Sequence, residues 1–205
     1  MAIYSVEDPS ASSVAVEALE SGEVILIPTE TVFGLTCDAI NEAAVARLFS
    51  IKRRSYSKQS AVFLSSVPEI DNYAIVETSA AKQIIRDFLP GPLTVILNSR
   101  KADWKGVVGP NGKIGIRISS DRFVTKIAKQ LNRPLIATSA NISGQPECST
   151  VADIQSQFAS ASLRIFFCAP LIQSLPSTVV DLTEDVPRLI REGSIPFAEI
   201  KAHLN

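Results

Sequence analysis

The sequence predicts an α/β fold, in which helices pack on the faces of a β-sheet, because strand-like and helix-like segments alternate along it. Short apolar runs of strand length, such as residues 23–27 and 134–137, are separated by longer segments with apolar residues at helical spacing. No internal repeat or low-complexity linker interrupts this alternation. A chain of 205 residues fits the prior of roughly 100–200 residues per domain, so we expect one domain over residues 1–205.

The first predicted elements are supported by signals at their ends. Residues 10–21 are alanine-rich with apolar positions at helical spacing, and Gly22 just beyond them can stop a helix. Residues 23–27 then have the apolar run of a buried strand. Asn41 can cap a second helix, which we expect to end near residue 51.

The middle of the chain continues the alternation. Residues 61–64 are a short apolar run typical of a buried strand. Residues 79–89 have helical spacing and stop at Pro90-Gly-Pro92, because a residue before proline disfavours the helical conformation. Residues 93–97 return to the strand pattern, and the glycine-rich residues 104–113 are expected to form a loop.

Alternation of apolar with small or charged residues predicts a strand over residues 114–118. Asp121 and Thr150 can cap helices over 121–131 and 150–158. Apolar runs bounded by turn residues predict the remaining strands, and Pro196 suits a helix start, which gives strands over 134–137, 165–167, 178–182 and 187–190 and a last helix from 196.

Composition excludes several classes of protein. The net charge is −1 with 20% charged residues, which argues against binding of nucleic acid or membrane through the overall field. Cys37, Cys148 and Cys168 are widely spaced, so neither a disulfide framework nor a zinc site is indicated. No basic segment leads into an apolar stretch at the N-terminus, and no window approaches the ~18 apolar residues of a membrane span. We therefore expect a soluble cytoplasmic protein without a membrane partner.

The most informative segment covers residues 25–35, an apolar run that stops at Pro28 and turns into hydroxyl residues and Gly34. This pattern predicts a buried strand that ends in a loop whose backbone approaches a ligand closely. Similar polar clusters follow Ala137 and precede Val179, also at predicted strand ends. Because ligands in open α/β sheets usually bind at strand ends, we expect these clusters to line one crevice.

The residue types in these clusters suit anion binding better than proton transfer. The only histidine, His203, lies near the C-terminus, which argues against a Ser-His or Cys-His nucleophile. No spacing of histidines and carboxylates offers a transition-metal cage, although magnesium carried on phosphates needs few protein ligands. Lys, Arg, Ser, Thr and Asn near glycines can bind phosphate and carboxylate oxygens. Such a site suits nucleotidyl transfer onto an already ionised carboxylate or carbamate.

Each of these features also has a plainer structural interpretation. Lys52-Arg-Arg54 at a helix end can be a solvated cap on the helix dipole, and Ser139-Ala-Asn141 can be an ordinary turn. Thr29 and Thr31 can satisfy backbone groups at a strand end. Arg117 is different, because a cation within a strand must be paired or face a polar cavity unless its side of the strand is exposed.

A set of short motifs runs across nearly the whole chain. They are Pro28-Thr-Glu-Thr-Val-Phe-Gly34, the Lys-x-Arg of Lys52 and Arg54, Gly91-Pro-Leu-Thr94, Gly115-Ile-Arg117, Thr138-Ser-Ala-Asn-Ile-Ser-Gly144, Ser177-Thr-Val-Val-Asp181, and Arg191 before Gly193. In this combination and order, they resemble the YrdC-type threonylcarbamoyladenylate synthases. Those proteins are single-domain relatives of a larger eukaryotic and archaeal enzyme that has an extra C-terminal domain.

The resemblance implies a twisted, mixed, largely open sheet with helices on both faces and a concave basic cavity. It also implies an L-threonylcarbamoyladenylate synthase, which joins L-threonine, bicarbonate and ATP and releases pyrophosphate. Mg²⁺ would be carried mainly by the ATP phosphates. The product would pass to the threonylcarbamoyl transferase machinery that forms threonylcarbamoyladenosine in tRNA, and weak tRNA binding would be compatible with synthesis.

Site residues follow from the motifs position by position. The family's threonine contacts fall on Thr31, Arg117, Ser139 and Ser177. The nucleotide contacts fall on Arg54, Lys58, Lys113, Asn141, Ser149 and Arg191. Lys52 and Arg54 of the Lys-x-Arg motif would be the catalytic cations, and no residue is expected to ligate a metal directly.

The chain departs from the family pattern in two places. Many relatives follow Lys-x-Arg with Pro, then a Pro-Leu pair and sometimes a histidine that touches threonine, where this chain has Ser55, Gln59-Ser60 and Phe63. Phe33 replaces the commoner tyrosine, which removes a hydroxyl and keeps the ring.

Two other functions remain as alternatives. An RNA- or tRNA-binding module would use the concave basic surface without chemistry, and the near-neutral net charge counts against it. Carbamoyl-adenylate chemistry, as in hydrogenase maturation, uses a related domain within a longer protein. The chain has no acylphosphatase-like or zinc-finger-like segment, which argues against that chemistry.

Overall fold

The structure is a computed structural model that describes residues 1–168 and 175–204. The strands are β1 (Ala2–Ser5), β2 (Ile25–Ile27), β3 (Gly34–Thr36), β4 (Ala61–Phe63), β5 (Ala74–Ile75), β6 (Leu93–Ser99), β7 (Lys113–Arg117), β8 (Leu135–Ser139), β9 (Arg164–Phe167), β10 (Thr178–Asp181) and β11 (Arg188–Arg191). The helices are α1 (Ala11–Glu20), α2 (Glu42–Ile51), α3 (Ile70–Tyr73), α4 (Ser79–Phe88), α5 (Arg122–Leu131), α6 (Val151–Gln157) and α7 (Phe197–Ala202), and the 3₁₀ turn η1 (Val67–Glu69) precedes α3.

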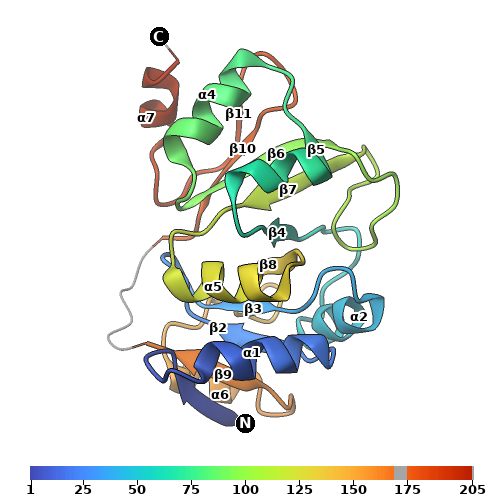
Figure 1. Ribbon diagram of the computed structural model, residues 1–205, viewed down its shortest axis with the longest axis vertical. Helices are drawn as coiled ribbons and strands as arrows, with labels where there is room; N and C mark the ends of the chain where they lie inside the picture. Colours follow the sequence, from blue (N-terminus) through green and yellow to red (C-terminus); the bar gives the residue numbers. More distant parts are fainter. Residues whose placement is uncertain (169–174, 205) are drawn as a thin grey trace.

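The strands form one mixed sheet in the order β1-β9-β2-β3-β8-β4-β7-β6-β10-β11, with β5 also paired to β6. Parallel pairs such as β4 with β7 stand beside antiparallel pairs such as β6 with β7. Figure 1 shows the sheet running along the long axis of the molecule, with the two chain ends at opposite ends of it. The predicted mixed sheet is confirmed.

Helices cover both faces of this sheet, as predicted. Ile25 and Ile27 of β2 belong to a core cluster that includes the apolar sides of α1 and α5. Leu26, between them, belongs to the other cluster, which includes α2, α4 and α6. Because successive strand side chains point to opposite faces, one short apolar strand supplies both cores.

Local end signals set the helix boundaries where the sequence places them. The Asn41 side chain accepts a hydrogen bond from the backbone N–H of Ala44 at 3.1 Å, which caps α2. Asp121 caps α5 through the N–H groups of Phe123 and Val124, and Thr150 caps α6. These caps satisfy donors that a helix N-terminus would otherwise leave without partners.

The segment after Pro28 differs from the prediction. Gly34 was expected in a loop, but Gly34–Thr36 form β3, which pairs antiparallel with β2. A Cβ atom at Gly34 would lie only 3.4 Å from the carbonyl oxygen of Thr138, so glycine allows β3 to pack closely against β8. The short elements β1, β5 and α3 were not predicted either.

Among the described residues, no helix covers one part of the sheet face, and the alternation of side chains along each strand determines which residues lie there. Along β6, Leu93, Val95 and Leu97 are buried in the core cluster that contains α4. Thr94 and Ile96 point the other way and line a cavity. No helix among the described residues has the length and apolar content needed to cross a membrane.

Candidate active site

A cavity of about 440 Å³ lies on the uncovered sheet face, and residues of β4, β6, β7, β8, β10 and β11 line it. Loop residues also contribute to its wall: Thr29, Val32, Phe33, Arg54, Gln59, Ser60, Val107, Gly109 and Asn111. Gly115 of β7 lies on this face between Lys113 and Arg117, and a Cβ atom there would lie 3.1 Å from the Cβ atom of Ala61. Because Gly115 has no side chain, the cavity is deeper between Lys113 and Arg117.

The structure brings together six of the predicted site residues in this cavity. Its wall includes Arg54, Lys113, Arg117, Ser139, Ser177 and Arg191. Thr31, Lys52 and Asn141 lie behind the wall, where each is hydrogen-bonded to a lining residue. Lys58 and Ser149 are not among the lining residues.

Arg117 is the most buried of the lining cations, with a side chain 8% exposed. Its Nη2 atom donates a hydrogen bond to Thr31 Oγ1 at 2.8 Å and pairs with Glu30 Oε1 at 3.0 Å. The ring of Phe63 lies 5.4 Å from the guanidinium carbon. Arg117 Nε is buried and has no hydrogen-bond partner among the described residues. Because a buried N–H group without a partner is costly, this group is suited to a ligand oxygen.

Ser177 is held at the same end of the cavity. Its hydroxyl lies 2.9 Å from Thr94 Oγ1, and its carbonyl accepts hydrogen bonds from Arg191 Nη2 at 2.9 Å and Nε at 3.3 Å. Burial and the charge of Arg117 lower the pKa of Arg191, against the charge of Glu147, which raises it. An anion in the cavity would relieve this repulsion between the two arginines.

Lys52 has a different position from the one predicted for a charge-stabilising cation. Its side chain is 1% exposed, and Nζ donates to the carbonyls of Ser139 and Asn141, the latter at 2.8 Å, and to Asn141 Oδ1 at 3.3 Å. Three acceptors match the three N–H bonds of an ammonium. Burial, and then repulsion from Arg54, lowers the pKa of Lys52 to about 7. Lys52 therefore supports residues 139–141 from behind the cavity wall.

Arg54 combines a cavity position with a loop contact. Its Nε donates to the carbonyl of Lys58 at 2.7 Å and Nη2 donates to the carbonyl of Gln59 at 2.6 Å, while burial lowers the pKa of Arg54. The Lys58 side chain is exposed, and the Ser149 hydroxyl bonds to Asp153 at the start of α6. The predicted nucleotide contacts of Lys58 and Ser149 remain predictions.

Motif reasoning gave no role to three residues around Lys113, namely Asp181, Thr183 and Arg188. Asp181 Oδ2 pairs with Lys113 Nζ at 2.8 Å and with Arg188 Nη2 at 3.2 Å. Thr183 Oγ1 accepts from Lys113 at 2.7 Å and donates to Asp181 Oδ1 at 2.7 Å. The strand period could have identified Asp181, because residues 177, 179 and 181 share one face. Glu30, Thr94 and Glu147 also belong to the site without having been predicted.

The protonation of the Asp181 carboxylate should lower the unfolding free energy of the protein at acid pH. Burial raises the pKa of Asp181, but hydrogen bonds from Lys113, Thr183 and Arg188 lower it more, from its ordinary value of 3.8 to about 2. Because the folded-state pKa is depressed, its stabilising contribution is full above about pH 4 and is lost as pH falls towards 2. Asp181→Asn should therefore flatten the fall in unfolding free energy between pH 4 and 2, measured by urea denaturation. An unchanged pH slope would contradict this assignment.

The cavity is basic overall. Five cations line it, Arg54, Lys113, Arg117, Arg188 and Arg191, against the two carboxylates Glu147 and Asp181. Among the described residues, no group of three His, Cys, Asp or Glu side chains is placed to hold a metal ion. Fixed cations and hydroxyls in a partly closed hollow can bind phosphate and carboxylate groups and stabilise charge that develops between them.

Comparison with known proteins identifies the family to which this architecture belongs. A family model named Sua5_yciO_yrdC, described as "Telomere recombination", matches residues 17–193. The chain belongs to this family. A threonylcarbamoyl-AMP synthase of Vibrio vulnificus is 34% identical over 180 residues, which cover 87% of this chain and 96% of that protein. The family predicted from the motifs is therefore confirmed.

Solved structures of family members share the fold. The crystal structure of Pyrococcus abyssi Sua5 complexed with L-threonine matches 99% of this chain with a TM-score of 0.89 and 27% identity, and this chain spans 60% of that one. Escherichia coli YciO matches with a TM-score of 0.83 and 25% identity over 94% of each chain. The family model covers residues 17–193, which include every residue that lines the cavity, so the cavity lies in the part of the chain that the family shares.

Proposed function

We propose that this chain, as a single domain, makes L-threonylcarbamoyladenylate from L-threonine, bicarbonate and ATP, with release of pyrophosphate. The convergence of Arg54, Arg117, Ser139, Ser177 and Arg191 on one cavity is the observation that carries the proposal. Support comes from relatives named threonylcarbamoyl-AMP synthase and from the L-threonine complex of the P. abyssi protein.

Threonine belongs at the Arg117 end of the cavity. The threonine carboxylate would accept hydrogen bonds from Arg117, whose Nε has no partner among the described residues. Ser177 and Thr94 are paired beside this position, and Ser139 of β8 lines the same cavity. These hydroxyls are suited to the polar groups of the amino acid.

The nucleotide belongs with the remaining cations of the wall. Arg54, Arg191 and Lys113 would bind phosphate oxygens, and the Asn141 amide, which Lys52 and Ser139 orient, would contact the nucleotide. Lys58 and Ser149 would complete the site from the two loops next to it.

The chemistry needs alignment and neutralisation of charge more than a base. Threonine's amine combines with bicarbonate to give an N-carboxylate, with loss of water. A carboxylate oxygen then forms a bond to the α-phosphorus while the bond from that phosphorus to the bridging oxygen breaks, and the electron pair leaves on pyrophosphate. The fixed arginines and Lys113 stabilise the charge that develops on the transferring group.

We expect Mg²⁺ to enter this site bound to the phosphates of ATP. Asp181 is already paired with two cations, and Glu147 is the lining carboxylate without an ion pair among the described residues. The motifs name no direct metal ligand; because Mg²⁺ commonly uses one or two carboxylates together with substrate phosphates, Glu147 is the residue that we add as its protein ligand. When bound, the ion would neutralise phosphate charge.

The product is a mixed anhydride that water destroys readily, so a separate threonylcarbamoyl transferase must take it up promptly and pass the acyl group to tRNA. We place the reaction in the cytoplasm, together with the tRNA that receives the acyl group. Weak docking of tRNA on the basic face would be compatible with synthesis.

The proposal is tested by incubating the purified protein with ATP, threonine and labelled bicarbonate. We expect label in an adenylate, formed together with an equal amount of pyrophosphate, and no label when threonine is omitted. Pyrophosphate release without incorporation of label would refute the assigned reaction.

A further inference from the structure

Beside Lys113, on the β10 and β11 side of the cavity, lie two residues to which the family motifs assign no substrate contact, Asp181 and Arg188. Asp181 has a side chain 6% exposed, and it contacts Lys113 from β7 and Arg188 from β11. Arg188 lines the cavity at its rim with a side chain 72% exposed. Its guanidinium carries five N–H bonds, and its hydrogen bond to Asp181 uses only one nitrogen atom, Nη2.

Strand register separates the Lys113 end of the cavity from the threonine end. Lys113 and Arg117 lie on the same face of β7, four residues and therefore about 13 Å apart. The neighbouring strands keep the same order, because Thr94 of β6 and Ser177 lie at the Arg117 end. Asp181 lies opposite Ile96 and Arg188 opposite Asp181, which places both of them towards Lys113.

The geometry of nucleotidyl transfer, an in-line displacement at the α-phosphorus, relates the Arg117 end of the cavity to the Lys113 end. If threonine's carboxylate lies at Arg117, the attacking oxygen, the α-phosphorus and the leaving oxygen must follow one another away from it. From the carboxylate carbon to the β-phosphorus, this arrangement spans roughly 9 Å at ordinary bond lengths. The side chains of Arg117 and Lys113, anchored about 13 Å apart, can contact both ends of it.

We propose that Arg188 and Lys113 bind the pyrophosphate portion of ATP and that Asp181 is the residue that positions them. This inference rests on the proposed function, since it takes its direction from threonine at Arg117. Asp181 uses one oxygen to hold both cations, and its other oxygen is fixed by Thr183. The remaining N–H groups of Lys113 and Arg188 are then available to phosphate oxygens.

Nucleotides of different phosphate length test the assignment. We expect Arg188→Ala to weaken ATP binding about tenfold, as loss of a charge-assisted hydrogen bond does, and to change AMP binding less than about twofold, measured by isothermal titration calorimetry. Arg188→Lys should restore part of the ATP affinity. Asp181→Asn should weaken the binding of ATP more than the binding of AMP. It should also raise the inhibition constant of pyrophosphate in the synthesis assay.

Arg133→Ala is the matched control, because Arg133 pairs at 2.9 Å with the buried Asp38 and does not line the cavity. It should leave the affinity for both nucleotides unchanged. Equal losses of ATP and AMP affinity in Arg188→Ala would assign this end to the nucleoside and overturn the inference. Unchanged ATP affinity would overturn it as well. Failure of the unsubstituted chain to bind ATP would refute the proposed function itself. Arg188 is exposed, so its truncation tests the inference even if Asp181→Asn fails to fold.

Discussion

Replacing Arg117 with alanine is expected to raise the threonine concentration needed for half-maximal synthesis by ~100-fold or more. The guanidinium would bind the threonine carboxylate through two charge-assisted hydrogen bonds, and alanine offers neither of them. The ATP requirement should change by less than about threefold, because Lys113, which would bind phosphate, lies about 13 Å from Arg117 along β7. Initial rates of pyrophosphate release, with each substrate varied in turn, measure both quantities.

Two further variants separate binding from folding in this experiment. Arg117→Lys keeps the charge near Glu30 but loses the planar fork, so it should recover stability without recovering most of the threonine affinity. Arg164→Ala removes an arginine that also pairs with a glutamate, Glu23, but lies outside the cavity, and it should leave both substrate requirements unchanged. Equal effects of Arg117→Ala on threonine and ATP would remove Arg117 from the threonine site.

The position of this site follows from the sheet. Helices α1 and α5 cover one part of a face, and Phe63 lies both in their core cluster and in the cavity wall. On the strands beyond it, that face carries polar, charged or small residues such as Thr94 and Gly115 among a few apolar ones such as Ile96, while their neighbours in sequence are buried in the core. A period of two is thus enough to produce an apolar core on one side of a strand and a polar cavity on the other.

The sequence predicts much of this arrangement because its signals are local. The caps at Asn41, Asp121 and Thr150 need only residues within one helical turn. A charged residue inside an apolar strand must be paired or face a polar cavity unless its side of the strand is exposed, and Arg117 is buried, paired with Glu30 and part of the cavity wall.

What the sequence does not predict depends on contacts between distant segments. The strand β3 has only three residues, and it forms because β2 and β8 lie on either side of it. The Asp181 cluster joins three strands through their register, which no local pattern encodes. The burial of Lys52 is not predicted for the same reason, because the carbonyls that surround it come from the distant residues 139–141.

The burial of Lys52 leads to the second large expected effect. Lys52→Ala should lower the unfolding free energy by about 3 kcal/mol, because the carbonyls of Ser139 and Asn141 lose their donor and remain buried. In a chain of this length, that corresponds to a fall of roughly 10 °C in Tm. Synthesis should fall by at least ~100-fold even at temperatures well below Tm, since Ser139 and Asn141 lose the support that orients them.

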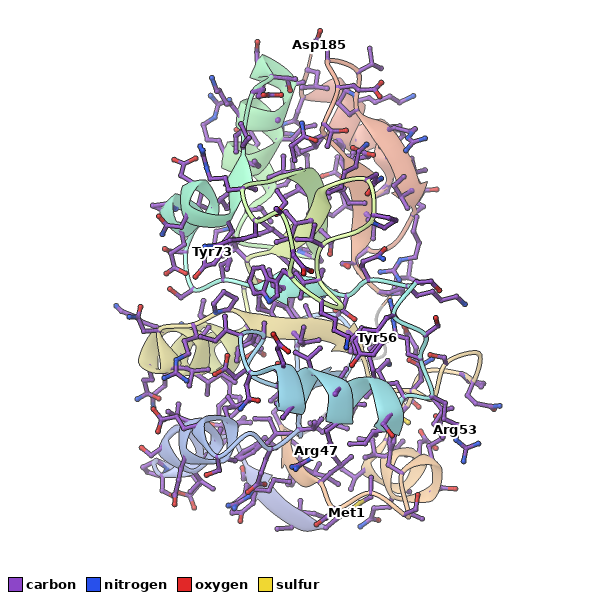
Figure 2. All side chains as sticks on the ribbon, turned by 90° about the vertical axis from the view of Figure 1, so that its right-hand side faces the viewer. Met1, Arg47, Arg53, Tyr56, Tyr73 and Asp185 are labelled. Carbon is purple, nitrogen blue, oxygen red and sulfur yellow. The ribbon has the colours of Figure 1, made fainter. Side chains whose placement is uncertain are left out.

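Arg53→Gln is the control for this variant, because Arg53 is the next residue and its side chain points into solvent (Figure 2). It should leave both Tm and synthesis nearly unchanged. Thermal unfolding and the kcat and KM values for both substrates distinguish the outcomes. If Lys52→Ala lowers kcat but leaves Tm at its original value, Lys52 acts on the substrates directly, as the Lys-x-Arg motif predicted. If both fall together, Lys52 acts by holding residues 139–141 in place, because its three hydrogen bonds all go to that segment.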